Sequence, residues 1–321
     1  MGEDADMRSH PLVKAEAVSA AVIEPRGSIG FLIRCAQQIH TRYWTWEFDG
    51  ILTGPQYAVL AAVGRWPGID QRRAGELASL DKSSAADVVG RLADFGWLAR
   101  DSDAVDQRKR VLRLTPPARA ALRGITPRVQ HVQQRLTSNL SEGNAAEFIS
   151  LLARVAYRSP SDLDVEPAEV DADVIGISTA PGHLLRRAQQ VHTALWGTLV
   201  GEELTGPQYA VVATLVRHGE MNQKQLGESA SLDKSVVADV VQRLHHKGLL
   251  VKDRDPADAR RRLLRMTVAG NELLDKVTPG VAQVQEALLD PLSPDEAEKL
   301  LYMLRKVCQE PGSAGFSPAA S

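Results

Sequence analysis

Two stretches of the chain carry cations and small hydroxyl side chains at matching positions. Residues 79–92 read SLDKSSAADVVGRL, and residues 231–244 read SLDKSVVADVVQRL. Lysine and serine at the start of a helix suit contact with phosphates, because backbone N–H groups at a helix N-terminus also favour an anion. Small side chains would let such a helix enter the major groove and meet base edges or thymine methyl groups. The pattern therefore predicts two sites for duplex DNA.

A second set of cations follows each stretch, between two short apolar runs typical of a hairpin. Cations on a protruding tip suit phosphate contact or insertion into the minor groove. Asp106 and Asp258 each precede an arginine by two residues and can orient its guanidinium through a charge-assisted pair. The predicted DNA contacts are Lys82, Ser83, Ser84, Arg91, Asp106, Arg108, Lys109 and Arg110 in the first copy, and Lys234, Ser235, Val236, Gln242, Arg243, Arg254, Asp258, Arg260, Arg261 and Arg262 in the second.

The elements that position these residues are themselves duplicated. An offset of 152 positions aligns most of the chain without a gap, and LTGPQYAV occurs at both 52–59 and 204–211. Each repeat is about 150 residues long, which is the size of a domain. The predicted segments are an N-terminal arm (1–26), a first unit (27–158), a linker (159–178), a second unit (179–309) and a disordered tail (310–321).

Within each unit the apolar periodicity is helical, with one predicted strand pair. Apolar residues at three- to five-residue steps predict a long first helix. Thr53 and Thr205 are suited to cap the next helix. A short helix, the Ser-Leu-Asp turn and the DNA-reading helix follow, then a hairpin of 97–100 with 111–114, or 249–252 with 263–266. Two further helices close each unit, at 116–138 with 142–157 and at 268–289 with 294–308.

The composition is that of an ordinary globular protein and excludes several classes of function. Of 321 residues, 44% are hydrophobic and 24% charged, and the net charge is −2. Two cysteines exclude a disulfide framework and a cysteine-based zinc site. No apolar run suits a secretion signal or a membrane span, so a cytoplasmic protein is expected. No cluster typical of an enzyme, metal site or cofactor site recurs in both halves, and we expect none.

The combination of motifs resembles one family. LTGPQYAV, the Leu-Asp-Lys-Ser helix and the Asp-x-Arg hairpin (Asp106 to Thr115; Asp258 to Thr267) are similar to the MarR family of bacterial transcriptional regulators, over about 27–158 and again over about 179–309. The resemblance implies a mainly α-helical winged helix-turn-helix (α+β) fold and homodimers whose terminal helices interlock. Two fused units then imply a single-chain pseudodimer with one shared helical bundle, acting as a monomer.

The implied function is a repressor that binds an operator with two related half-sites. Ser84 differs from Val236, Ala85 from Val237 and Gly90 from Gln242, so unequal half-sites are expected. An alternative is a winged-helix module that docks proteins or has an architectural role. A second alternative is that one of the two repeats has lost the ability to bind DNA.

A small aromatic or phenolic effector is the expected regulator, because relatives bind such ligands between the bundle and the DNA-binding part. His40 and Trp44 share a helix face, as do His192 and Trp196. With Tyr57 and Tyr209 they would suit a planar anion, through stacking and hydrogen bonds from their polar tips. The alternative interpretation is that these residues belong to the core.

Cys35 leads to a redox-sensing alternative, since some relatives sense peroxide through a cysteine in the first helix. Arg187 occupies its position in the second repeat. No repeated or nearby partner cysteine is expected, so a packed thiol is the favoured interpretation.

Overall fold

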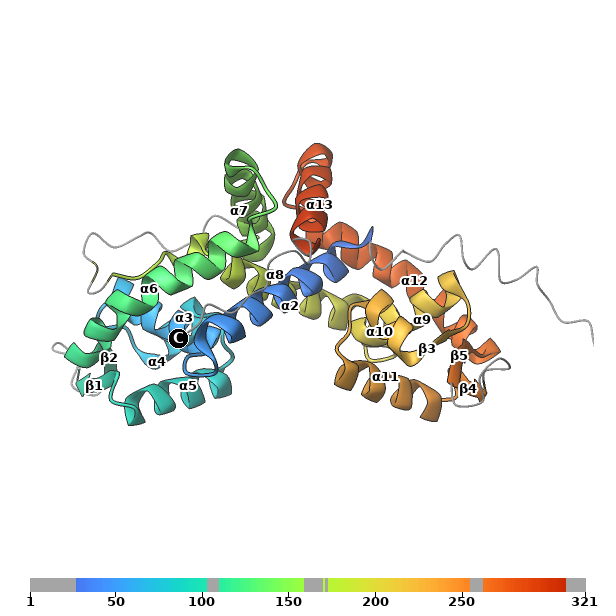
Figure 1. The fold of residues 1–321 in the computed structure, drawn as a ribbon, viewed down its shortest axis with the longest axis horizontal. Coiled ribbons are helices and arrows are strands. Elements are labelled where there is room, and N and C mark those ends of the chain that lie inside the picture. The colour runs from blue at the N-terminus through green and yellow to red at the C-terminus, as the bar shows by residue number, and fades with distance from the viewer. Residues whose placement is uncertain (1–26, 103–109, 159–169, 171–172, 255–261, 310–321) are drawn as a thin grey trace, which may run out of the picture. The chain divides into compact units, whose positions relative to one another are not determined.

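The helix-rich fold was obtained as a computed structural model that describes residues 27–102, 110–158, 170, 173–254 and 262–309. Apart from one short additional strand in the second half, both halves of the chain form the same series of elements (Figure 1). The first half contains α2 (Ile29–Phe48), α3 (Gly54–Arg65), α4 (Gln71–Leu77), α5 (Lys82–Asp94), β1 (Leu98–Ser102), β2 (Arg110–Leu114), α6 (Pro116–Leu136) and α7 (Glu142–Tyr157). In the described part of the chain, no helix is both long and apolar enough to cross a membrane.

The second half repeats this order after a short 3-10 turn, η3 (Ile177–Thr179). Its elements are α8 (Pro181–Leu199), α9 (Gly206–His218), β3 (Met221–Asn222), α10 (Gln223–Ala230), α11 (Lys234–His246), β4 (Leu250–Arg254), β5 (Arg262–Met266), α12 (Val268–Leu289) and α13 (Pro294–Cys308). We call α3 to β2 the first winged lobe and α9 to β5 the second. The predicted winged helix-turn-helix is confirmed in both.

Local sequence signals account for the helix boundaries. Thr53 accepts from the backbone N–H of Gln56, and the Gln56 side chain returns a bond to the Thr53 backbone, which is a capping box at the start of α3. Thr205 and Gln208 repeat it in α9. Gly96 follows α5 with a positive φ of 78°, a conformation in which glycine lacks the steric cost of a side chain.

The hairpins pair antiparallel in the predicted places. Leu98 pairs with Leu114 in the first lobe, and Leu250 with Met266 in the second. The second lobe adds β3 at the edge of β5, a strand that the sequence pattern did not predict. At the corresponding place the first lobe has an isolated bridge, Asp70 with Val111. Two residues are too short a run to show alternation, so only tertiary pairing reveals β3.

The chain forms two compact units whose boundaries differ from those of the two sequence repeats. One unit contains residues 32–191 with 288–321, and the other contains 1–31 with 192–287. The core of the first winged lobe also takes in Val174 and Ile177, from the predicted linker. A separate core lies in the second winged lobe. Each compact unit therefore contains residues of both repeats. The expected boundaries at 27–158 and 179–309 describe the sequence repeat and remain a prediction.

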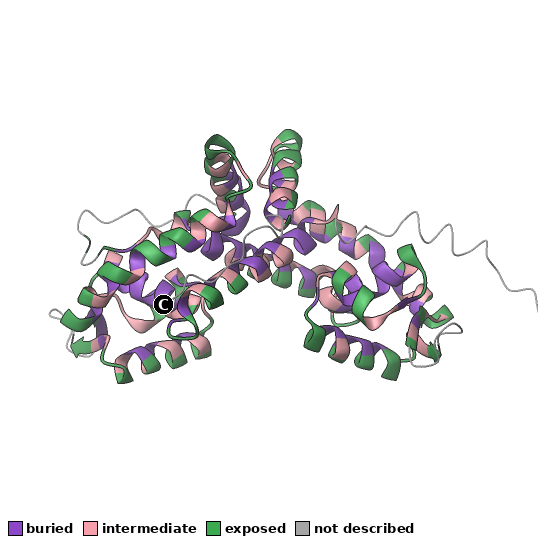
Figure 2. Cartoon of the chain, in the orientation of Figure 1, coloured by how far each residue is buried: buried purple, intermediate pink, exposed green. Residues whose placement is uncertain are grey.

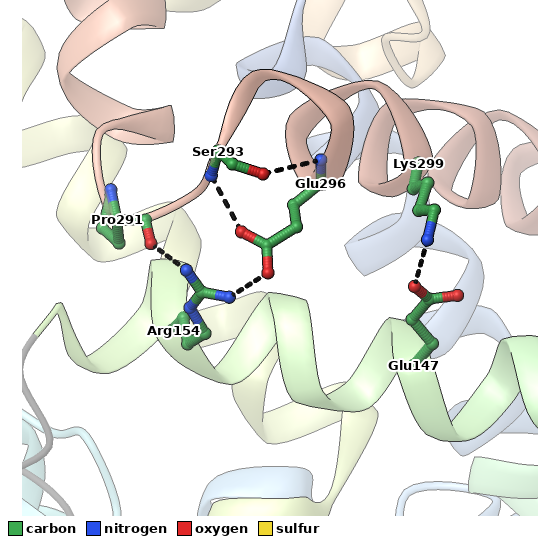
Figure 3. A network of polar contacts seen from close by, with 6 residues as sticks. All are labelled: Glu147, Arg154, Pro291, Ser293, Glu296 and Lys299. Carbon is green, nitrogen blue, oxygen red and sulfur yellow. Dashed lines mark hydrogen bonds and ion pairs between the residues drawn. The ribbon is translucent and has the colours of Figure 1, made fainter.

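Helices α7 and α13, the last of each repeat, pack together within the unit of residues 32–191 and 288–321 (Figure 3). Arg154 pairs with Glu296 at 2.5 Å and also donates to the carbonyl of Pro291. Lys299 pairs with Glu147 at 2.9 Å, and these two residues are 152 positions apart. Equivalent positions of the two repeats thus face each other with opposite charges.

Candidate DNA interface and effector cavity

The two predicted DNA-reading helices each have one buried and one exposed face (Figure 2). In α5, Lys82 and Ser83 are exposed, whereas Val89 and Leu92 are buried. In α11, Lys234, Ser235 and Val236 are exposed, and Val236 keeps 38% of its surface. Gln242 also lies on the exposed face.

One expected difference between the two helices lies in the core instead of on the DNA-facing surface. Ala85 is 3% exposed and Val237 is 2% exposed. They pack at Gly75 and Gly227 respectively, where a glycine Cβ would lie 2.7 Å from the Ala85 Cβ and 3.3 Å from a Val237 methyl. The expectation that Ala85 and Val237 face DNA is wrong, because this helical position points at the preceding short helix.

The start of α5 is occupied by the carboxylate of Asp81. It accepts from the backbone N–H groups of Ser83 and Ser84 at 2.9 Å each, and from their hydroxyls at 2.7 and 2.6 Å. These bonds, chiefly those from Ser84, hold the pKa of Asp81 far below its usual range. The expectation of free N–H groups for a phosphate is therefore wrong at Ser83 and Ser84. Their hydroxyl oxygens remain as acceptors.

The start of α11 differs, because the Asp233 side chain makes no capping bond there. Further along, the two helices agree again. Arg91 pairs with Asp87 at 3.0 Å, and Arg243 pairs with Asp239 at 2.9 Å. Each pair joins residues four apart on the exposed face, so both arginines are held along their helix.

The hairpin ends carry exposed arginines. Arg110 lies opposite Ser102 and donates to its hydroxyl at 3.3 Å. Arg254 and Arg262 lie directly opposite each other. Like charges at opposed positions destabilise a hairpin, so this pair suits an anionic partner. Six predicted contacts lie outside the described residues: Asp106, Arg108, Lys109, Asp258, Arg260 and Arg261.

A cavity of about 250 Å³ lies beside the first winged lobe, and its lining includes His40, Trp44 and Tyr57. The structure thus brings these three predicted residues together. His40 lies 5.7 Å from Trp44, and Trp44 lies 6.0 Å from Tyr57, measured between ring centroids. The matching rings of the second half cluster similarly, with His192 5.6 Å from Trp196 and Trp196 5.8 Å from Tyr209.

The polar tips of the aromatic cluster already have internal partners. The Trp44 indole donates to the carbonyl of Leu52 at 2.6 Å, and Trp196 donates to Leu204 at 2.7 Å. The Tyr57 hydroxyl contacts the Thr126 hydroxyl at 3.3 Å and accepts from the backbone N–H of Ile175 at 3.2 Å. Burial also raises the pKa of Tyr57. The rings can stack on a ligand, but the tips of Trp44 and Tyr57 serve the fold.

His40 is buried against a glycine of the other repeat. A Cβ on Gly182 would lie 2.1 Å from the Nε2 of His40, so only glycine fits. Gln133 bridges the two: its amide oxygen accepts from Gly182 N–H at 2.8 Å, and its amide nitrogen lies 3.2 Å from His40 Nε2. Nε2 therefore accepts, as in a neutral imidazole. Gly30 and His192 repeat the close approach, because a Cβ on Gly30 would lie 2.2 Å from the Nε2 of His192.

Burial of His40 gives a pH dependence of stability with a definite sign. Burial first, and then the charge of Arg186, lowers the pKa of His40 from 6.5 to about 4. The unfolded chain binds one more proton between these values, so the free energy of unfolding rises with pH across that window. Acidifying from pH 7 to pH 4 should cost about 3 kcal/mol through His40. Urea unfolding at each pH gives the free energy of unfolding of wild type and of His40→Gln, and the difference between the two is the contribution of His40. The same dependence on pH in both proteins would contradict this prediction.

The charged group of the cavity is one that the sequence interpretation missed. Arg186 of α8 lines the cavity together with His183. Burial lowers the pKa of Arg186 to about 10, and no carboxylate among the described residues forms an ion pair with it. A signal existed, because Arg34 occupies the same position in the first repeat. A cation repeated inside an apolar helix stripe marks a buried position with a polar role.

The two cysteines lie together, contrary to expectation. The Cys308 thiol contacts Cys35, and it donates to the carbonyl of Leu32 at 3.4 Å. The expectation of no nearby partner for Cys35 is therefore wrong. Contact with Cys35 and burial raise the pKa of Cys308, which opposes formation of the reactive thiolate. The redox-sensing alternative therefore gains a partner thiol in the geometry, whereas the raised pKa of Cys308 opposes it.

Comparison with known proteins adds an independent result. A model of the MarR family matches residues 204–261. The chain is 32% identical over 158 residues to the HTH-type transcriptional repressor NicR of Pseudomonas putida, covering 49% of this chain and 96% of NicR. It is 35% identical over 125 residues to the transcriptional regulator HosA of Escherichia coli O111:H-, covering 39% of this chain and 92% of HosA.

Solved structures are similar as well. The PcaV transcriptional regulator from Streptomyces coelicolor, in complex with its natural ligand, is 43% identical. The match covers 42% of this chain and 95% of PcaV, with a TM-score of 0.41. Each of these relatives is matched over nearly its whole length by less than half of this chain.

Proposed function

Because the chain belongs to the MarR family of transcriptional regulators, we propose that α5 and α11 recognise two unequal half-sites of one operator. The chain is a DNA-binding regulator of this family. Support for two functional helices comes from what both repeats present to solvent: a lysine at the helix start, an arginine held by an aspartate, and a cationic hairpin end. Support for unequal half-sites comes from the helix starts, which carry different side chains in different bonding states.

The half-site difference should depend on Val236. Its exposed methyl groups suit a thymine methyl, whereas Ser84 at the matching position is bonded to Asp81. Val236→Ser should move the preferred second half-site towards the first, with about a 10-fold change in preference at one base pair. Selection of bound duplexes from a random pool measures this.

Val237→Ala provides a matched control for that experiment. It also introduces the side chain of the first repeat, but at a buried position. It should lower stability and leave base preference unchanged. If Val237→Ala shifts the selected sequences and Val236→Ser does not, the assignment of the DNA-facing side is wrong.

We further propose that one chain performs the work of a dimer. The compact unit that contains the first winged lobe also contains the first part of α8 and all of α13 from the second repeat. The ion pair between Glu147 and Lys299 supports pairing of unlike repeats (Figure 3). Pairing of two first repeats at this position would bring Glu147 against its own copy, which is unfavourable.

A single chain should therefore bind one duplex that contains both half-sites. Mass measurement in solution should give one chain of 34.9 kDa per duplex. Two chains on a duplex with a single pair of half-sites would contradict the pseudodimer. A duplex that carries one half-site is the control and should bind more weakly.

The effector that the cavity fits best is a small aromatic carboxylate. Arg186 carries this proposal, since a buried guanidinium that has no carboxylate partner among the described residues favours an incoming anion. Trp44 and Tyr57 supply ring surfaces beside it. Binding of benzoate and its hydroxylated derivatives, with the matching benzamides as uncharged controls, tests the proposal. Equal affinity for acids and amides would refute it.

Repression follows from the geometry that the operator requires. Two recognition helices on one face of a duplex must match major grooves about 34 Å apart. A ligand that prefers a different arrangement of the winged lobe shifts the chain away from the DNA-bound state. Addition of a binding acid should therefore release the operator, which gel-shift titration with and without the acid measures.

A further inference from the structure

The turn between α4 and α5 decides where the recognition helix of the first lobe points. Ser79 lies in this turn with a positive φ of 51° and is only 5% exposed. Backbone bonds from Ser79 N–H to Glu76 and from Leu80 N–H to Gly75 close the turn internally. A non-glycine residue in this conformation costs free energy and is kept only where its surroundings hold it.

Four side chains of α8 hold this turn from outside the lobe. Gln190 donates to the carbonyl of Ser79 at 2.8 Å, and Arg187 donates to the Ser79 hydroxyl at 3.4 Å. Arg186 donates to the carbonyl of Ala78. His183 Nε2 lies 3.3 Å from the Ser79 hydroxyl. We call His183, Arg186, Arg187 and Gln190 the strap; all four lie in the same compact unit as the turn.

The strap is itself anchored to α7. Arg187 donates to the carbonyl of Ala156 at 3.0 Å, and its guanidinium lies 4.3 Å from the ring centroid of Tyr157. The Tyr157 hydroxyl lies 3.4 Å from His183 Nε2. The turn is thus connected to α7 through Arg187 and His183.

The tautomer of His183 follows from its neighbours. Arg186 can only donate, so at 3.1 Å from His183 Nδ1 it requires that nitrogen to accept. Nε2 then carries the hydrogen and donates to Ser79 or Tyr157. Burial, with the charges of Arg186 and Arg187, holds the pKa of His183 well below its usual range, consistent with a neutral ring. Bonding thus runs in one direction, from Arg186 through His183 to the turn.

Arg186 has a second role, because it lines the effector cavity as well as holding Ala78. Its Nε is buried and has no hydrogen-bond partner within the part of the chain that the structure describes. A carboxylate is a stronger acceptor for a guanidinium than a neutral carbonyl is. An acid in the cavity would therefore compete with Ala78 for this side chain.

We propose that the strap positions the recognition helix of the first lobe, and that an aromatic acid loosens it by drawing Arg186 away from Ala78. The second part rests on the effector proposed above. Two of the four strap residues differ between the repeats. At the positions of His183 and Arg187, the first repeat carries Phe31 and Cys35, although Ser231 matches Ser79. Neither a phenyl ring nor a thiol can replace these imidazole and guanidinium bonds, so the contacts of His183 and Arg187 are specific to the first lobe, whereas Arg34 and Gln38 repeat Arg186 and Gln190.

The ligand-free test gives α8 the residues of the first repeat, as His183→Phe with Arg187→Cys under reducing conditions. Amide hydrogen exchange at Ser79 and Leu80 should become about 10-fold faster, which corresponds to one lost hydrogen bond. Affinity for the half-site of α5 should fall about 10-fold, whereas that for the half-site of α11 should stay unchanged. Arg123→Cys, on an exposed face of α6, is the control for charge loss and an added thiol.

Two results would overturn the strap. One is unchanged exchange at Ser79 and Leu80 in the double variant. The other is an equal fall in affinity at both half-sites, which would indicate general destabilisation instead of positioning. As a conservative variant, Arg187→Lys keeps a donor and should retain part of the protection.

The same exchange measurement with an added acid distinguishes the release of Arg186 from the binding of the effector. Saturating benzoate should accelerate exchange at Ser79 and Leu80 in wild type, and benzamide should not. If benzoate binds through Arg186 and exchange stays the same, the release step is wrong while the effector cavity stands. If no acid of the series binds, the effector proposal and the release step both fail, and the strap is judged by the double variant alone.

Discussion

Replacing Arg110 and Arg262 together with alanine should weaken duplex binding about 100-fold at physiological salt. The two residues occupy equivalent exposed positions at the ends of β2 and β5. A hydrogen bond to a charged group contributes about 1.5–3 kcal/mol, and solvent exposure places these arginines at the low end of that range. Two such contacts account for the expected loss.

Salt dependence distinguishes phosphate contacts from a change of fold. Loss of two phosphate contacts should lower the slope of log affinity against log salt by about 1.8, because each contributes about 0.9. Fluorescence anisotropy of a labelled operator at several salt concentrations measures both quantities. An unchanged slope would show that Arg110 and Arg262 do not contact phosphates.

A matched control lies on the same strands. Arg113 pairs with Asp101 at 3.4 Å, and Arg265 pairs with Asp253 at 2.9 Å, again at equivalent positions. Arg113→Ala with Arg265→Ala removes the same charge from arginines that already have carboxylate partners. We expect a much smaller effect on affinity. An equal effect would mean that net charge, and not position at the hairpin end, determines binding.

The second large effect concerns the cavity. Arg186→Met should lower the affinity for benzoate-type acids about 100-fold, since removing one partner of a buried charged pair costs about 2–5 kcal/mol. Binding of the matching benzamides should change little, because they need no cation. Quenching of tryptophan fluorescence is a suitable measurement, because Trp44 lines the cavity.

Two comparisons make the Arg186 result specific. Arg128→Met removes an arginine whose guanidinium pairs with Glu47 at 2.9 Å and does not line the cavity, so acid affinity should stay unchanged. A parallel loss of acid and amide binding by Arg186→Met would indicate a collapsed cavity. Retention of acid binding would show that another group receives the carboxylate.

The two proposals lead to an unequal regulator. Both lobes present a recognition helix, but only the first is held by His183 and Arg187. The two half-sites would then respond unequally to an acid. Divergence of this kind is open to a fused chain, because a homodimer must place the same residue at both positions.

The elements of this protein were largely determined by its sequence. Caps such as Thr53 with Gln56, the apolar periodicity and the glycine after α5 are local signals, because helix ends need partners within a few residues. The 152-residue repeat required no structure to detect. The winged fold and the residues of the aromatic cluster followed from these signals. The strand β3 escaped, because two residues carry no periodicity.

Tertiary structure alone decided which residues meet. Arg186 reaches the cavity from a helix more than 100 residues beyond Trp44 and Tyr57, and no local pattern encodes such a contact. Similarly, helical spacing could not tell that Ala85 and Val237 face a glycine instead of DNA. The bonds to Ser79 are a third example, since they depend on how α8 packs against another repeat. Packing over long sequence separations assigns partners to polar side chains, whereas sequence alone specifies that such side chains are present.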